Sequence, residues 1–197
     1  MHAILCGVID GALLRITVIT NPRSALTRRA FLRIGSALLA ASANRSWAIP
    51  ATRSLAFTHT HTGETLNVTY WRDGAYDRAG LTAVNHYLRD FRTGDMHAIA
   101  PGLLDYLHTV QCKLGCDAPF AVISGFRSSA TNDLLYRTTS GVAPHSLHLE
   151  GRAIDIRIPG VKTRHLREAA AGLQLGGVGY YLASDFVHLD TGRFRQW

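Results

Sequence analysis

The chain has 197 residues, which suits one domain with room for a tail, and its 47% hydrophobic residues are enough to build a core. The formal net charge of +7 is uneven: residues 1–48 hold six arginines and one aspartate, whereas residues 49–197 hold 15 basic and 13 acidic residues. This distribution argues against a nucleic-acid-binding protein, because the basic character lies mostly in the N-terminal segment.

The N-terminal segment, residues 1–48, is typical of a leader that carries a twin-arginine export signal. Arg28 and Arg29 precede an apolar run rich in Ala and Ser, and the run ends in Ser46-Trp47-Ala48, a small-x-small cleavage site. The run is too short to predict a membrane span with any strength. A basic amphipathic helix is the alternative interpretation of the same residues.

The expected domain organisation follows from this signal. Cleavage after Ala48 would leave one domain, residues 49–197, in the periplasm, with no stable membrane span and with a monomer as the expected state. Residues 1–20 fit poorly, because the arginine pair of such signals usually lies closer to the start. Either a misassigned start codon or an additional hydrophobic segment accounts for them, and the sequence leaves both explanations open.

The remaining sequence alternates between strand and helix patterns. Thr, Val, Tyr and Trp around Gly63 predict two strands over 54–74, and apolar residues at helical spacing predict helices over 78–92 and 100–115. The further expected elements are a strand over 120–126 with a helix opening after it, a loop over 141–146, a strand over 151–160, a helix over 163–173, a Gly-rich turn and strand over 176–181, and a strand over 185–192.

Two other pairs of metal-capable side chains have ordinary explanations. His59 and His61 alternate and would share one face of a strand, but exposed histidines in a hairpin are commoner than a metal pair. Cys112 and Cys116 have no nearby partner that completes a familiar zinc spacing. A disulfide between them is geometrically allowed in an exported protein, although two buried thiols are the favoured interpretation.

Three residues in the second half of the chain are candidates for a metal site. Alternation over 151–160 places Asp155 on the face opposite three isoleucines, and His148 lies just before a turn at Gly151. His188 projects from the non-aliphatic face of the last expected strand. If the two strands are neighbours, the three side chains converge, and two imidazoles with one carboxylate form a catalytic zinc set that leaves a position for water.

A hydrolytic site also needs a proton acceptor and a positive group near the developing oxyanion. Asp185 lies three residues before His188 and could reach the water, and Arg127 ends a strand and could stabilise an oxyanion or clamp a carboxylate. Asp190 could orient the outer ring nitrogen of His188. His145 lies in a loop and is left outside the metal shell. Each of these residues alone has an ordinary structural explanation, so the prediction depends on their combination.

The order of these motifs resembles that of a known family. The pattern S-x-H-x-x-G-x-A-x-D is met by "SLHLEGRAID" (146–155), with "SGFRS" before it and "DFVH" after it. The set is similar to the zinc D,D-peptidase family, peptidase M15, and over 54–197 it is most similar to the YcbK-like branch. The resemblance implies an α+β fold of the kind shared by the hedgehog signalling domain and the D-Ala-D-Ala peptidases, with a central antiparallel sheet and packed helices.

The resemblance also implies roles for single residues. His148, Asp155 and His188 would bind Zn²⁺, Asp185 would be the catalytic acid/base, and Arg127 would stabilise the scissile carbonyl or its oxyanion. Many relatives have Glu at the position of Asp185, so the reach of the shorter side chain stays open.

The implied function is that of a zinc-dependent murein endopeptidase in cell-wall remodelling. Its substrate would be crosslinked peptidoglycan stem peptides, with the bond between two diaminopimelate residues as one candidate. A D-Ala-D-Ala carboxypeptidase and a non-catalytic cell-wall-binding module are the alternatives.

Overall fold

The structure is a computed structural model that describes residues 52–139 and 142–197. The expected leader over 1–48 lies outside these residues. Within them, no helix has both the length and the apolar composition that crossing a bilayer requires.

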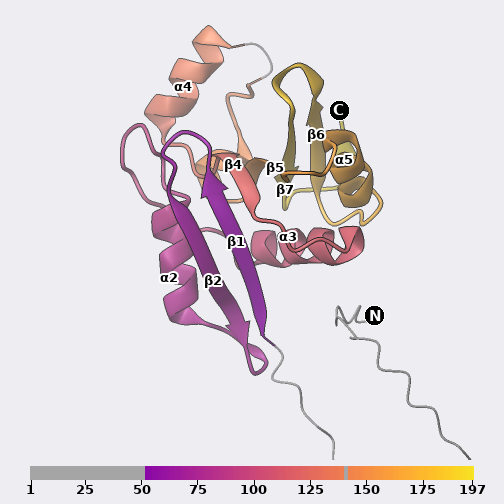
Figure 1. Ribbon diagram of the computed structural model, residues 1–197. Coiled ribbons are helices and arrows are strands. Elements are labelled where there is room, and N and C mark those ends of the chain that lie inside the picture. Colours follow the sequence, from indigo (N-terminus) through magenta and orange to yellow (C-terminus); the bar gives the residue numbers. More distant parts are fainter. Residues whose placement is uncertain (1–51, 140–141) are drawn as a thin grey trace, which may run out of the picture. The chain divides into compact units, whose positions relative to one another are not determined.

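Eight strands form one sheet in the order β3-β2-β1-β4-β5-β7-β6-β8, flanked by helices (Figure 1). The expected α+β class is confirmed, but the sheet is mixed instead of wholly antiparallel, because β1 pairs with β4, and β6 with β8, in parallel. The β1–β4 pair needs a long crossover, which the helices between them provide. The strands are β1 (Arg53–His59), β2 (Thr65–Arg72), β3 (Ala75–Tyr76), β4 (Phe120–Ser124), β5 (Ala153–Arg157), β6 (Gly177–Tyr181), β7 (Phe186–Asp190) and β8 (Arg195–Gln196).

Three of the four described α-helices pack against the sheet or against each other: α2 against β2, α3 against β1 and α5, and α5 against β6 and β7. The helix expected over 78–92 ends earlier, at Tyr87. Beyond it, the Asp90 carboxylate accepts the Arg92 backbone N–H at 3.0 Å, a local contact that competes with helical pairing. The helical elements are α2 (Arg78–Tyr87), α3 (Pro101–Leu114), α4 (Ser129–Thr138), α5 (Thr163–Ala171) and the short 3₁₀ turns η1 (Leu147–Glu150) and η2 (Leu182–Ser184).

The pairing of β5 with β7 separates an apolar face of the sheet from a polar one. Ile154 lies opposite Leu189 and Ile156 opposite Val187, and all four are fully buried in the core. Successive side chains of a strand point to opposite faces. The residues between them, including Asp155, therefore project from the other face.

The β1–β2 turn corrects one expectation. β1 ends at His59 and His61 lies in the turn, so the two histidines do not continue one strand face. His59 is buried, and its Nδ1 accepts the backbone N–H groups of His61 and Thr62. In the described part of the chain neither histidine belongs to a metal-capable group.

The cysteine pair lies at the C-terminal end of α3. Cys112 and Cys116 are not bonded to each other, and both are half-buried where buried thiols were expected. The Cys116 sulfur accepts the Ala118 backbone N–H at 3.4 Å. The expectation that these two residues do not form a disulfide is therefore confirmed, whereas the expectation of full burial was wrong.

Candidate metal centre

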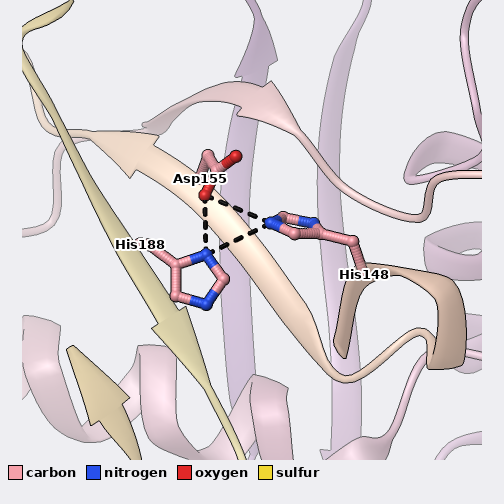
Figure 2. A group of neighbouring side chains, drawn as sticks. All are labelled: His148, Asp155 and His188. Atoms are coloured by element: carbon pink, nitrogen blue, oxygen red, sulfur yellow. Dashed lines mark hydrogen bonds and ion pairs between the residues drawn. The ribbon is translucent and has the colours of Figure 1, made fainter. Parts of the chain in front are cut away.

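Three side chains from different elements converge on the polar face of the sheet. Asp155 comes from β5, His188 from β7 and His148 from η1, and Figure 2 shows their inner atoms facing one another. His148 Nε2 lies 3.2 Å from both Asp155 Oδ1 and His188 Nδ1, and His188 Nδ1 lies 2.8 Å from Asp155 Oδ1. All three residues are buried. The convergence expected from strand alternation is confirmed.

Strand register brings two of the three together. Asp155 lies directly opposite His188 in the antiparallel β5–β7 pair. Side chains of directly opposite residues share a face and lie close together. The sequence prediction depended on these two strands being neighbours, and β5 and β7 are paired in the structure.

The backbone at Gly151 brings in the third residue. Gly151 ends η1 with φ +64°, and a Cβ there would overlap the Ala98 carbonyl. A left-handed conformation with no space for a side chain requires glycine. At the other end of the turn, the Ser146 hydroxyl accepts the His148 backbone N–H at 3.4 Å. The turn therefore returns His148 to the start of β5.

The outer nitrogens of both imidazoles are held by acceptors. His148 Nδ1 lies 2.6 Å from the Gly125 carbonyl oxygen, and His188 Nε2 lies 3.0 Å from Asp190 Oδ2. Each outer nitrogen therefore donates, and each inner nitrogen of a neutral ring keeps its lone pair. Asp190 therefore lies where the sequence predicted it, at the outer nitrogen of His188. Asp190 itself is anchored by Arg195, whose guanidinium contacts both of its oxygens at 2.7 and 3.0 Å.

This donor set fits a small divalent metal ion. Tetrahedral zinc with bonds of about 2.0–2.1 Å places its ligand atoms roughly 3.3 Å apart. The three observed separations, 3.2, 3.2 and 2.8 Å, are close to that spacing. In the described residues the group has three members of the His, Cys, Asp and Glu types, so it has no fourth protein ligand to close the shell.

The local charges favour ionised Asp155. Burial opposes its ionisation, but His148, His188 and Arg127 outweigh burial and hold the pKa of this carboxyl well below its usual value. Burial lowers the pKa of His148, which favours the neutral ring. Burial also acts to lower the pKa of His188, but Asp155 and Asp190 outweigh it and the net shift is upward. A buried anion beside two imidazoles is a cation-binding arrangement.

Arg127 reaches the cluster from the end of β4. Its guanidinium donates to Asp155 Oδ2 and, at 2.9 Å, to Ser124 Oγ. The Arg127 side chain is only 11% exposed. The sequence therefore predicted correctly that this positive charge lies beside the three candidate ligands.

Asp185 is not brought to the cluster. It adopts φ +49° after η2, and its carboxylate accepts the Thr163 hydroxyl at 2.8 Å and faces Arg157 at 3.5 Å. Its side chain is 62% exposed. The predicted acid/base role thus stays a prediction, and in the structure the carboxylate is engaged outside the three-residue group.

A cavity of about 660 Å³ opens over the cluster. His145, left outside the site by sequence reasoning, is exposed and lines this cavity without joining the cluster. Other lining residues were missed altogether, above all Arg92 and Trp197. The Trp197 ring lies 5.4 Å from the His188 ring and occupies the space over Gly179, which has no side chain. No motif spacing in the sequence indicates either residue.

Comparison with known proteins gives a consistent result. Residues 48–197 match the model of a family described as "Peptidoglycan L,D-endopeptidase MepK". A protein of that name from Escherichia coli (strain K12) is 39% identical over 164 residues, which cover 83% of this chain and 90% of the relative. A "Probable peptidoglycan L,D-endopeptidase MepK" from Haemophilus influenzae is 36% identical over 167 residues, covering 84% of this chain and 90% of the relative.

Proposed function

Because the chain belongs to the peptidase M15 family, in the group described as peptidoglycan L,D-endopeptidase MepK, we propose that it is a metal-dependent murein endopeptidase. The predicted family resemblance is confirmed. The observation that carries the proposal is the buried His148, Asp155 and His188 group, which has three protein ligands and lies at the base of a cavity. Three protein ligands with an open position are typical of catalytic zinc, whereas structural zinc is closed by a fourth.

We propose zinc as the metal and His148, Asp155 and His188 as its ligands. Bound there, zinc would lower the pKa of a water molecule and polarise the scissile carbonyl. Gly125 and Asp190 hold the outer nitrogens of the two imidazoles, so the rings need no reorientation. Arg127 directs its guanidinium toward the same space and would stabilise the carbonyl oxygen as negative charge develops on it.

The proposed substrate is a peptide crosslink between peptidoglycan stem peptides. The name of the relatives, L,D-endopeptidase, specifies an L,D bond, which suits a crosslink from the L-centre of one diaminopimelate residue to the D-centre of another. The cavity of about 660 Å³ is in the usual size range for a site that takes a small peptide segment. The proposed location is the periplasm, reached by twin-arginine export directed by residues 1–48, with the chain acting as a monomer.

We further propose that the α+β fold is of the hedgehog and D-Ala-D-Ala-peptidase kind. Support comes from a sheet whose apolar face packs on helices while its other face carries the metal ligands.

Mass spectrometry of digested peptidoglycan tests the function. The zinc-loaded protein should convert crosslinked dimers to monomers, and both a chelator and the His188→Ala substitution should abolish this. Release of D-alanine from uncrosslinked pentapeptides, with dimers left intact, would assign a carboxypeptidase instead. Binding to cell walls without any cleavage by the zinc-loaded protein would indicate a non-catalytic module.

A further inference from the structure

The cavity over the metal centre has an excess of positive charge. Four arginines line it, whereas Asp155 is its one acidic lining side chain and belongs to the proposed metal shell. Three of the arginines have carboxylate partners in the structure. These pairs are Arg127 with Asp155, Arg157 with Asp185, and Arg195 with Asp190.

Arg92 is the exception among the four. Across residues 52–139 and 142–197 its guanidinium forms no ion pair and no hydrogen bond, and it lies over the Phe91 ring, 4.2 Å from the ring centroid. The nearest carboxylate in sequence, Asp90, is buried and already occupied by the Ser128 N–H at 2.9 Å and the Ser128 hydroxyl at 2.7 Å. Arg92 therefore presents to the cavity a guanidinium that no carboxylate binds directly.

The backbone at Arg92 is nevertheless held in place, and its guanidinium lies on an aromatic ring. Its backbone N–H donates to Asp90 Oδ1 at 3.0 Å, and the other oxygen of Asp90 binds Ser128, the residue that follows Arg127. The Phe91 ring under its guanidinium also stacks on His61, a second cavity-lining residue, with ring centroids 4.6 Å apart. A cation held on an aromatic ring loses less entropy when it binds an anion than a freely rotating side chain does.

The pKa shifts of the groups that line the cavity also favour binding of an anion beside Arg92. Burial lowers the pKa of Arg92, the negative charge of Asp90 offsets part of this lowering, and the positive charge of Arg127 adds a smaller lowering effect. Burial and then Arg92 also lower the pKa of His61. An anion placed beside Arg92 would favour the charged form of Arg92 against burial and would offset its repulsion of Arg127.

We propose that Arg92 binds a free carboxylate of the stem peptide, so that the enzyme selects substrates by this negative charge. The inference rests on the proposed function and adds a recognition residue to it. The planar guanidinium can bind a carboxylate through two parallel hydrogen bonds. Peptidoglycan stem peptides offer two sources of this group, the diaminopimelate carboxylates that are not used in the crosslink and the glutamate carboxylates.

Arg92→Gln tests the proposal with three crosslinked dimers. One has all carboxylates free, one has its diaminopimelate carboxylates converted to carboxamides, and one has its glutamate carboxylates converted. A hydrogen bond to a charged group contributes about 1.5–3 kcal/mol, so we expect KM for the free dimer to rise about 10- to 100-fold while kcat changes little. The dimer whose amidation removes the effect of Arg92→Gln identifies the carboxylate that binds Arg92.

Controls separate recognition from damage to the site. Arg164→Gln, at an exposed position on α5, should leave KM and kcat unchanged. Arg92→Lys should recover part of the loss, because it restores the charge without the two-pronged geometry. An equal rise in KM on all three dimers, or no rise on any, would overturn the proposal.

Calorimetric binding of the same dimers to the zinc-loaded protein separates this inference from the proposed function. If no dimer is cleaved but Arg92→Gln weakens binding of the free dimer selectively, then the proposed hydrolysis is wrong and carboxylate recognition stands. If dimers are cleaved and the variant binds them as tightly as the wild type does, carboxylate recognition is wrong and hydrolysis stands. If the zinc-loaded protein neither cleaves nor binds the dimers, both proposals are wrong.

Discussion

His188 Nε2 lies 3.0 Å from Asp190 Oδ2, and the two residues are two positions apart on the same strand. Strand alternation alone puts them on one face. The contact makes Nε2 the donating nitrogen and leaves Nδ1 facing Asp155. One five-residue strand therefore supplies both a candidate ligand and the group that sets its tautomer.

Asp190→Asn should weaken metal binding without unfolding the protein. The amide keeps the size of the carboxylate but loses its charge, and loss of such an outer partner typically costs 10- to 100-fold in metal affinity. Competition with a chromophoric chelator measures the change. Asp133→Asn, at an exposed position on α4, is the matched control and should bind zinc as tightly as the wild type does. Unchanged affinity in Asp190→Asn would show that the Asp190 contact does not tune the ligand.

Zinc should stabilise the metal-stripped protein. The folded state alone brings the three ligands together, so a zinc concentration 100 times Kd should add about 2.7 kcal/mol to the free energy of unfolding. For a chain of this size that is a rise of roughly 5–10 °C in Tm. Differential scanning calorimetry of wild type and His148→Ala measures it. A similar rise in His148→Ala would mean that zinc binds elsewhere.

Asp185→Asn tests the acid/base assignment. If Asp185 only binds Thr163 and faces Arg157, as in the structure, hydrolysis of crosslinked dimers should fall less than about tenfold. Loss of a general acid/base typically costs about 10²- to 10⁴-fold. Steady-state kcat therefore distinguishes the two roles, and a loss in that higher range would assign Asp185 to catalysis as the sequence predicts.

Gly151→Ala should destabilise the turn that carries His148. Two costs add: the left-handed backbone at φ +64° and the overlap of a new Cβ with the Ala98 carbonyl. Together they should lower the free energy of unfolding by about 2–4 kcal/mol. Gly160→Ala is the control, because φ is +81° there but nothing lies near the added Cβ. Gly160→Ala should therefore lose only the free energy of unfolding that the left-handed backbone costs. Equal losses for the two variants in denaturant titrations would contradict a contribution from the overlap with Ala98.

Asp90 should make stability depend on pH in the acid range. Burial acts to raise its pKa, but hydrogen bonds from Thr131, Ser128 and Arg92 outweigh it and the net pKa is lowered. The unfolded state, with an Asp pKa of about 3.9, then binds the proton first as pH falls. The stabilising contribution of Asp90 is present above that value and is lost as pH falls through the lower pKa of the folded state.

Asp90→Asn tests the direction of this change in stability with pH. The variant should be less stable than the wild type at pH 7, by about 1–3 kcal/mol, and the difference should shrink as pH falls below about 4. Urea titrations between pH 3 and 7 measure both. A difference that is constant over this range would show that ionisation of Asp90 contributes nothing.

Side-chain alternation explains which parts of the site could be predicted. Asp155 and His188 lie within regular strands, where period-two patterning fixes the face, and the glycine after His148 marks the turn. Asp185 lies one residue before β7 with φ +49°, where alternation does not fix the direction of a side chain, so its acid/base role stays a prediction.

The features that sequence reasoning missed depend on tertiary contacts. Arg92 lies in a segment that continues a helical pattern, and the helix stops early because the Asp90 side chain binds the backbone of residues 92 and 128. The parallel pairing of β6 with the short strand β8, which brings Trp197 beside His188, has no local signal at all. Long-range pairing of this kind is set by packing of the whole sheet and not by local propensity.

The direct opposition of Asp155 and His188 has a consequence for folding fidelity. A slip of β7 by one residue would turn His188 toward the isoleucine layer and dismantle the metal-binding group. Only chains with the native register could then retain a metal ion at these residues. Zinc bound at these residues would therefore stabilise sheets in the native register and would leave misaligned sheets without that stabilisation.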